Sequence, residues 1–166
     1  HDAVARCTKP VIAAIGGWCI GGAIDLITAC DIRLASRDAQ FSLRETRLAM
    51  VADVGTLARL PGIINEGALR ELAFSGDDFD AARALQLGLV SQVTADQPAL
   101  FAAARALATR IAKNSPHTVQ GVKEVLNTQR EKRARESLET VALWNAAFLP
   151  SADLLEAMGA FMEKRE

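Results

Sequence analysis

Three acids and one glycine turn near the start of the chain have types and spacing that suit chemistry. Gly21 and Gly22 come directly before an apolar segment with helical character, and Asp25 follows three residues after the second glycine. Glu45 and Asp53 lie in the next stretch. The first N–H groups of a helix have no acceptor inside it, so they can face an oxygen atom. The turn is therefore predicted to hold an anion or a developing oxyanion, with carboxylates beside it.

Each of these features also has an ordinary structural interpretation. Glycine pairs at a strand-to-helix turn often serve packing. Asp25 can complement the helix dipole, a contribution of about 0.3–1 kcal/mol. Glu45 lies between Arg44 and Arg47 and can form a surface ion pair with either, while Asp53 can be an N-cap. The three acids together favour a functional site over three unrelated structural roles.

The elements that would position these residues alternate up to about residue 96. The hydrophobic pattern predicts strands at 11–15, 31–36, 40–42 and 89–93, and helices after Gly22 and at 54–60, 64–74 and 81–87, the last capped by Asp80 and ended by Gly88. This alternation indicates an α/β core. Residues 99–113, 115–126, 131–148 and 154–162 are predicted to be helices that form a packed layer. Trp18 and Phe41 are expected to pack in the core.

Composition excludes several classes of protein. The 166 residues are 50% hydrophobic, enough for the core of one domain, and the net charge of −1 comes from basic residues spread among acids. We expect no nucleic-acid surface, and no apolar run approaches the roughly 20 residues of a membrane span. No G-x-G-x-x-G or G-K-[ST] fingerprint is present.

Cysteines and histidines give no metal signature. Cys7, Cys19 and Cys30 lack the paired spacing of zinc ligands and are predicted to be buried reduced thiols. His1 and His117 have no acid or cysteine at metal spacing. We therefore expect no metal site, and His117 is interpreted as a residue in the first turn of a helix.

Several separated motifs occur in one order along the chain. They are Lys9-Pro10-Val11-Ile12-Ala13-Ala14, Gly16-Gly17-Trp18-Cys19-Ile20-Gly21-Gly22, Cys30-Asp31-Ile32-Arg33, Ala39-Gln40-Phe41, Phe74-Ser75-Gly76, Gly88-Leu89-Val90, Asn114-Ser115-Pro116 and Ala160-Phe161-Met162-Glu163-Lys164-Arg165. Together they closely resemble the enoyl-CoA hydratase/isomerase (crotonase) superfamily. The resemblance implies a crotonase-like ββα spiral core in residues 1–96, with its N-terminal part missing, and a C-terminal helical trimerisation region in 97–166.

The resemblance also implies partners. The family acts on acyl-CoA thioesters without a further cofactor and forms homotrimers, often paired into hexamers. Its members carry a substantial segment before the position of His1, so we expect that segment, and with it the second oxyanion donor, to be absent. The ending Lys164-Arg165-Glu166 lacks a peroxisomal Ser-Lys-Leu address, so we expect a cytoplasmic protein.

The acids resemble one subfamily in particular. Hydratases carry two glutamates at the positions of Asp25 and Glu45 and a small residue where Asp53 falls, whereas three acids are the pattern of Δ3,5-Δ2,4-dienoyl-CoA isomerases. That activity moves a diene within fatty-acid β-oxidation by proton transfer from C2 to C6. The resemblance implies that Glu45 is the base at C2 and that the N–H of Gly22, in the turn with Gly21, is one oxyanion donor.

The two remaining acids receive complementary expectations. Asp53 would deliver the proton at C6, so an apolar setting from Leu48, Met50 and Val51 should keep it protonated. Asp25 would orient or tune the other two. Two alternatives remain open: hydration of a 2-enoyl-CoA by Asp25 and Glu45, and a non-catalytic acyl-CoA-binding member of the fold.

Overall fold

Successive strands of the chain enter two different three-stranded sheets. The computed structural model describes the backbone of residues 1–165 and all of their side chains outside 129–135. One sheet has the order β1 (Ile12–Ile15), β3 (Ile32–Ser36), β6 (Gln92–Thr94), and the other has the order β2 (Trp18–Ile20), β4 (Gln40–Ser42), β5 (Asp78–Asp80). All pairs are parallel except β4 with β5. The predicted α/β core is therefore confirmed.

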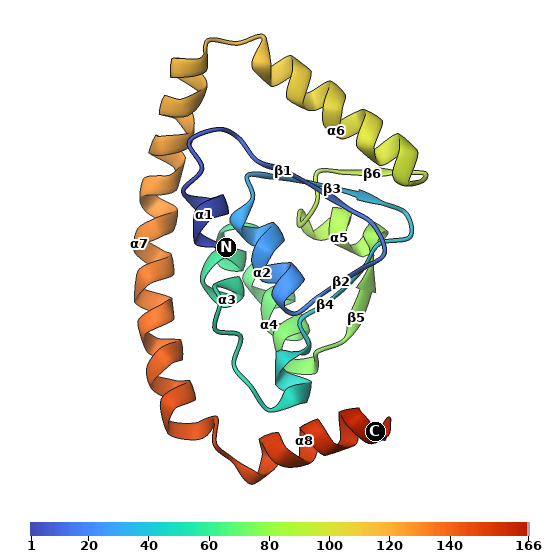
Figure 1. Cartoon of the computed structure of the whole chain (residues 1–166), viewed down its shortest axis with the longest axis vertical. Coiled ribbons are helices and arrows are strands. Elements are labelled where there is room, and N and C mark those ends of the chain that lie inside the picture. Colours follow the sequence, from blue (N-terminus) through green and yellow to red (C-terminus); the bar gives the residue numbers. More distant parts are fainter. Residues whose placement is uncertain (166) are drawn as a thin grey trace.

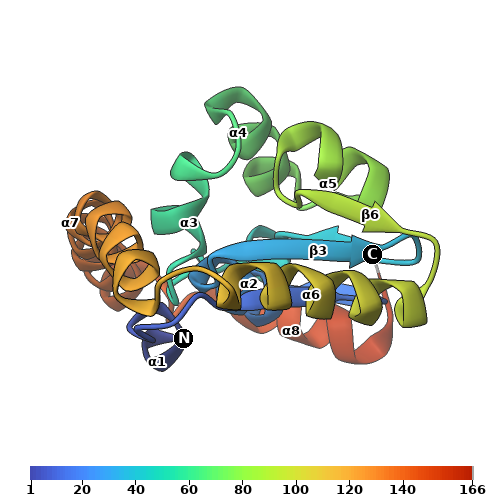
Figure 2. The ribbon, with the colours of Figure 1, turned by 90° about the horizontal axis from the view of Figure 1, so that it is seen from above.

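Helices surround both sheets. They are α1 (Asp2–Ala5), α2 (Gly22–Ala29), α3 (Thr56–Arg59), α4 (Glu66–Ser75), α5 (Ala81–Leu87), α6 (Gln97–Ala112), α7 (Pro116–Phe148) and α8 (Ala152–Glu163), with 3₁₀ helices η1 (Arg44–Leu48) and η2 (Leu60–Gly62). Figure 1 shows α6, α7 and α8 running around three sides of the core. Figure 2 shows α5 on one face of β3 and α6 on the other.

Aromatic and aliphatic side chains from both sheets build the core. Phe41 of β4 is completely buried and stacks on Phe79 of β5 with ring centroids 5.4 Å apart. Ile24 of α2 is buried in the same cluster. The expectation for Phe41 is confirmed, but that for Trp18 is wrong: its side chain is 65% exposed and lies 5.8 Å from the Arg44 guanidinium.

Local sequence signals predicted the ends of several helices correctly. Asp80 caps α5 by accepting a hydrogen bond from the Arg83 N–H at 2.8 Å, and Gly88 ends this helix with φ of 78°. Gly76 ends α4 with φ of 66°, close to the predicted end at residue 74, while the cap of this helix by Asn65 was not predicted. These capping residues fix where the chain turns back toward the sheets.

Two predictions of secondary structure are wrong. Residues 115–126 and 131–148 were expected to form separate helices, but α7 is continuous over 33 residues. Residues 127–130 contain no glycine or proline, so nothing in the chain interrupts the helix. The strands β2 and β5 were not predicted: each has only three residues, and these lie between glycine pairs in β2 and among aspartates in β5, which are not typical of strands.

The division of the chain at residues 96 and 97 stays a prediction. Helix α6 begins at Gln97 and packs directly on β1, β3 and β6. Among the described residues, no helix is both long and apolar enough to cross a membrane.

Candidate active site

The glycine turn lies where β2 gives way to α2. Gly21 has a φ of 52°, a conformation that favours glycine, and its N–H donates to the Ser42 carbonyl at 3.2 Å. Gly22 is the first residue of α2, so its N–H has no acceptor within the helix. A Cβ added at Gly22 would meet nothing within 4 Å. Of the two predicted glycines, Gly22 therefore has the N–H suited to an oxyanion, while Gly21 shapes the turn.

Glu45 stands directly over this turn. Strand β4 ends at Ser42, and η1 then carries the half-buried Glu45 side chain back toward Gly21. A Cβ built on Gly21 would lie 3.4 Å from Glu45 Oε1. The carboxylate and the start of α2 are therefore neighbours in space.

Ion pairs hold η1 in place without involving Glu45. Arg44 binds Asp78 with an Nη2–Oδ2 distance of 2.6 Å, and Arg47 binds Asp77 at 2.6 Å. The alternative in which Glu45 pairs with either arginine is therefore wrong, since both bind aspartates near β5.

The electrostatics of the site couple the three predicted acids. Burial raises the pKa of Glu45 above its usual range, and the negative charges of Asp25 and Asp53 raise it further, against an opposing hydrogen bond from the backbone of Glu45. The structure thus brings Asp25, Glu45 and Asp53 close enough for their charges to interact. A carboxylate with a raised pKa is the stronger base.

Asp25 is engaged in the core. Its side chain is 2% exposed, and its Oδ1 accepts hydrogen bonds from the Thr56 N–H at 2.7 Å and the Thr56 hydroxyl at 2.6 Å. Because Thr56 begins α3, the carboxylate joins the first turn of α2 to the first turn of α3. The alternative of a simple dipole complement does not account for these two contacts.

Asp53 lies in the loop between η1 and α3, and its side chain is exposed. The N-cap of α3 is Gly55, so the alternative that Asp53 caps this helix is wrong. The expected apolar enclosure is also wrong within this chain, because Leu48, Met50 and Val51 are themselves only partly buried.

The loop that carries Asp53 is held by side chains that sequence reasoning missed. Asn145 of α7 donates from Nδ2 to the Val51 carbonyl at 3.1 Å, and Arg59 of α3 donates from Nη1 to the Val54 carbonyl at 3.2 Å. Gly55 has a φ of 115°, a conformation that favours glycine, and the Arg59 guanidinium lies against its Cα. Asn145 is 94 residues from Val51, and no local signal connects them.

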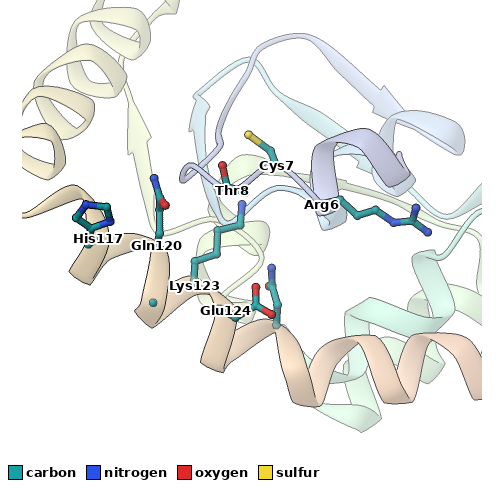
Figure 3. Close-up of a pocket in the computed structure, with 9 residues that line it drawn as sticks. Arg6, Cys7, Thr8, His117, Gln120, Lys123 and Glu124 are labelled. Carbon is teal, nitrogen blue, oxygen red and sulfur yellow. The ribbon is translucent and has the colours of Figure 1, made fainter.

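A cavity of about 500 Å³ lies elsewhere, between α7 and the segment that leads into β1. Figure 3 shows Lys123 extending from α7 toward Thr8, with His117 nearer the start of the same helix. The Lys123 ammonium donates to Asp31 Oδ2 at 2.7 Å and to the Lys9 carbonyl at 2.9 Å. None of the three acids lines this cavity, so it is distinct from the candidate active site.

Cysteine and histidine are the remaining candidate metal ligands, and the expectation of no metal site stays a prediction. No group of histidine, cysteine, aspartate and glutamate among the described residues is arranged to hold a metal ion. Cys19 and Cys30 are buried and Cys7 is partly buried, and all three are thiols rather than disulfides. Burial raises the pKa of Cys19 to about 12, which keeps this thiol unreactive. His117 lies in the first turn of α7.

Comparison with known proteins identifies the family. The model of the enoyl-CoA hydratase/isomerase family matches residues 1–166, so the chain belongs to this family. The structure of an enoyl-CoA hydratase from Mycobacterium avium superposes with a TM-score of 0.89 at 30% identity, covering 99% of this chain and 64% of that one. That of an enoyl-CoA hydratase/isomerase from Pseudoalteromonas atlantica superposes with a TM-score of 0.91 at 27% identity, covering 99% and 66%. The predicted crotonase-like fold is confirmed.

Sequence relatives share a narrower name. The mitochondrial Δ(3,5)-Δ(2,4)-dienoyl-CoA isomerase of Dictyostelium discoideum is 50% identical over 165 residues, 99% of this chain and 56% of that protein. The peroxisomal enzyme of the same name from Arabidopsis thaliana is 49% identical, over 99% of this chain and 59% of that protein. The chain therefore spans less than two thirds of these relatives. Since they are named mitochondrial and peroxisomal, they lend no support to a cytoplasmic location, which stays a prediction.

Proposed function

We propose that the protein isomerises 3,5-dienoyl-CoA to 2,4-dienoyl-CoA. The observation that carries this proposal is the position of Glu45 over the turn at Gly21, with the charges of Asp25 and Asp53 both raising the pKa of Glu45. A reaction that removes a proton at one carbon and returns one at another needs two acid–base groups. The names of the relatives from Dictyostelium discoideum and Arabidopsis thaliana support the same reaction.

The first step removes the proton from C2. With the thioester oxygen facing the Gly22 N–H, the substrate places C2 beside Glu45, whose carboxylate lies over the neighbouring Gly21. Glu45 takes the proton, and the electron pair moves into the thioester to give an extended dienolate. The N–H at the start of α2 stabilises the oxyanion, aided by the helix dipole.

The second step returns a proton at C6. Asp53 donates it, the double bonds settle between C2 and C3 and between C4 and C5, and Glu45 is left protonated. Asp53 is exposed in the free chain. In the proposed complex, the apolar acyl chain of the substrate lies against this carboxyl and excludes water from it. A proton then returns from Glu45 to Asp53 before the next turnover.

Asp25 serves this reaction without touching the substrate. Its carboxylate is bound to Thr56, so it orients the start of α3, while its charge contributes to the raised pKa of Glu45. No metal or other cofactor takes part in the proposed chemistry, since the acyl-CoA thioester supplies the electron sink.

The test is an ultraviolet assay of the full-length protein with a 3,5-dienoyl-CoA, following the 2,4-dienoyl thioester. We expect turnover that falls on the order of 10²–10⁴-fold in both Glu45→Gln and Asp53→Asn, the range lost with a general acid or base. Thr128→Val, a change at an exposed position of α7, is the control and should retain activity.

Hydration of a 2-enoyl-CoA is the second candidate. The exposure of Asp53 favours it, because a hydratase does not need an acid at this position. Turnover of a 2-enoyl-CoA that survives Asp53→Asn, without conversion of the dienoyl substrate, would replace the proposal by this activity. Binding of acyl-CoA with neither reaction would indicate a non-catalytic member of the fold.

We further propose that the protein assembles as a homotrimer or as a hexamer of two trimers. Large apolar side chains are exposed along α7 and α8, among them Trp144, Phe148, Phe161 and Met162. Surfaces of this kind usually mark protein contacts. Light scattering of the full-length protein measures the assembly directly, and a monomer at micromolar concentration would contradict this proposal.

A further inference from the structure

The backbone around Asp53 has little regular structure to hold it. Residues 50–55 belong to no helix or strand. The Met50 N–H donates to the Glu45 carbonyl at 3.0 Å, so the loop leaves directly from η1. At its far end, Arg59 binds the Val54 carbonyl and Asp25 binds Thr56. Between these two ends, Ala52 is buried, and among the described residues one long-range side-chain hydrogen bond reaches the loop.

That contact comes from Asn145. Its Nδ2 donates to the Val51 carbonyl at 3.1 Å, two residues before Asp53, and the side chain is half-buried. The backbone carbonyl of Asn145 accepts from the Leu149 N–H at 2.9 Å near the end of α7. The side chain amide is therefore directed to the loop rather than to the end of its own helix.

Helix α7 is firmly placed, so Asn145 offers a fixed point of attachment. Near its start, the ion pair of Lys123 with Asp31 joins α7 to the residue that precedes β3. Helix α3 also packs against α7. The hydrogen bond to Val51 thus ties the loop to a helix that is also anchored at Asp31, outside η1 and α3.

We infer that Asn145 is a positioning residue which, through the Val51 carbonyl, holds Asp53 on the same wall of the site as Glu45. This inference rests on the proposed function, in which Asp53 delivers the proton at C6. Among the described residues, no hydrogen bond joins the Asn145 side chain to the three acids or to the glycine turn. Its contribution should therefore depend on Asp53 and should affect the chemical step rather than substrate binding.

The experiment compares Asn145→Ala with Asn127→Ala in the full-length protein. Asn127 lies on the same helix, and no side-chain hydrogen bond is recorded for it among the described residues, so the control makes the same chemical change. We expect Asn145→Ala to lower kcat roughly 10- to 100-fold, since small displacements of a reacting group have effects of this size, with KM within about 2-fold. Asn127→Ala should change neither constant by more than about 2-fold.

A double-mutant cycle shows whether Asn145 acts through Asp53. If it does, adding Asn145→Ala to Asp53→Asn leaves kcat where Asp53→Asn alone placed it. Losses that multiply would overturn the inference, as would an unchanged kcat in Asn145→Ala. If Asn145→Ala does not unfold cooperatively, Asn145→Ser takes its place, and its kcat and KM are judged by the same criteria.

Hydrogen exchange separates this inference from the proposed function. Amides of residues 50–55 should exchange faster in Asn145→Ala than in Asn127→Ala, whatever the protein catalyses. A parent protein with no dienoyl-CoA isomerase activity refutes the proposed function, and exchange then decides whether Asn145 holds the loop. Equal exchange in the two variants refutes the inference even where the isomerase activity is present.

Discussion

The carboxylate of Asp25 accepts both the backbone N–H and the hydroxyl of Thr56, at 2.7 and 2.6 Å, inside the core. One oxygen atom thereby joins the first turns of α2 and α3. An acid that the sequence marks for chemistry is thus also part of the framework that sets the site.

Replacing Asp25 should separate these two roles. Asp25→Ala leaves two buried donors of Thr56 without an acceptor, and we expect it to cost about 2–4 kcal/mol of unfolding free energy. Asp25→Asn keeps an oxygen in place of Oδ1, so it should cost less than about 1 kcal/mol. It also removes a charge that raises the pKa of Glu45, so the activity profile should shift to lower pH. Urea unfolding measures the loss of stability, and kcat/KM against pH measures the shift of the profile. Equal destabilisation by Asp25→Ala and Asp25→Asn would contradict the structural role of the carboxylate.

The raised pKa of Glu45 should be visible in the pH dependence of catalysis. As the base at C2, Glu45 must be ionised, so kcat/KM should rise with pH along a limb displaced above the usual range of glutamate. Measurement of kcat/KM over a pH range that starts below the ordinary glutamate pKa of about 4.3 tests this expectation. A limb at the ordinary value of about 4.3 would show that the environment leaves Glu45 unperturbed.

The same shift should be visible in stability. Because the pKa of Glu45 is higher in the folded state, the folded protein binds the proton more tightly, and unfolding free energy falls as pH rises between the unfolded and folded pKa values. Glu45→Gln should therefore raise the melting temperature at pH 7 and leave it nearly unchanged below pH 4. The effect is modest, since solvent screens a half-buried group. Glu139→Gln, at an exposed position of α7, is the matched control and should show no such gain.

The ion pair between Lys123 and Asp31 should contribute to the attachment of α7. The side chains are 7% and 21% exposed, and the Lys123 ammonium also binds the Lys9 carbonyl. Lys123→Met leaves Asp31 with only the Val11 N–H, and we expect a loss of about 3–5 kcal/mol. The double variant with Asp31→Asn should lose less than the sum of the single changes. Lys113→Met, at an exposed position, should be nearly neutral in the same denaturant titration.

Local signals in the sequence predicted local structure. Asp80 and Gly88 mark the ends of α5 because a cap needs only a few neighbouring residues. The strand before Gly16 and the helix after Gly22 follow from the same short-range pattern. Continuity of α7 was not predicted, because a polar stretch within a long helix resembles a connection between two shorter ones.

Contacts between distant residues could not be predicted from one sequence. Asp25, Glu45 and Asp53 were selected by residue type and resemblance, but the hydrogen bonds of Asp25 to Thr56 depend on how α3 packs against α2. The partners of Arg44 and Arg47 are likewise set by β5, a strand too short to recognise. The catalytic roles of the three acids stay predictions, and the exposure of Asp53 is the point at which the expected surroundings and the observed ones differ.

The register of β2 with β4 divides the site into parts that can be altered separately. Ile20 pairs with Ser42, and the Gly21 N–H extends the ladder by one further bond, so the start of α2 and the segment leading to Glu45 leave the same sheet edge together. Asp53 is outside that ladder, on a loop whose carbonyls are bound by the side chains of Asn145 and Arg59. Under the proposed mechanism, a library confined to residues 50–55 therefore varies the group that returns the proton while leaving unchanged the segment that carries Glu45.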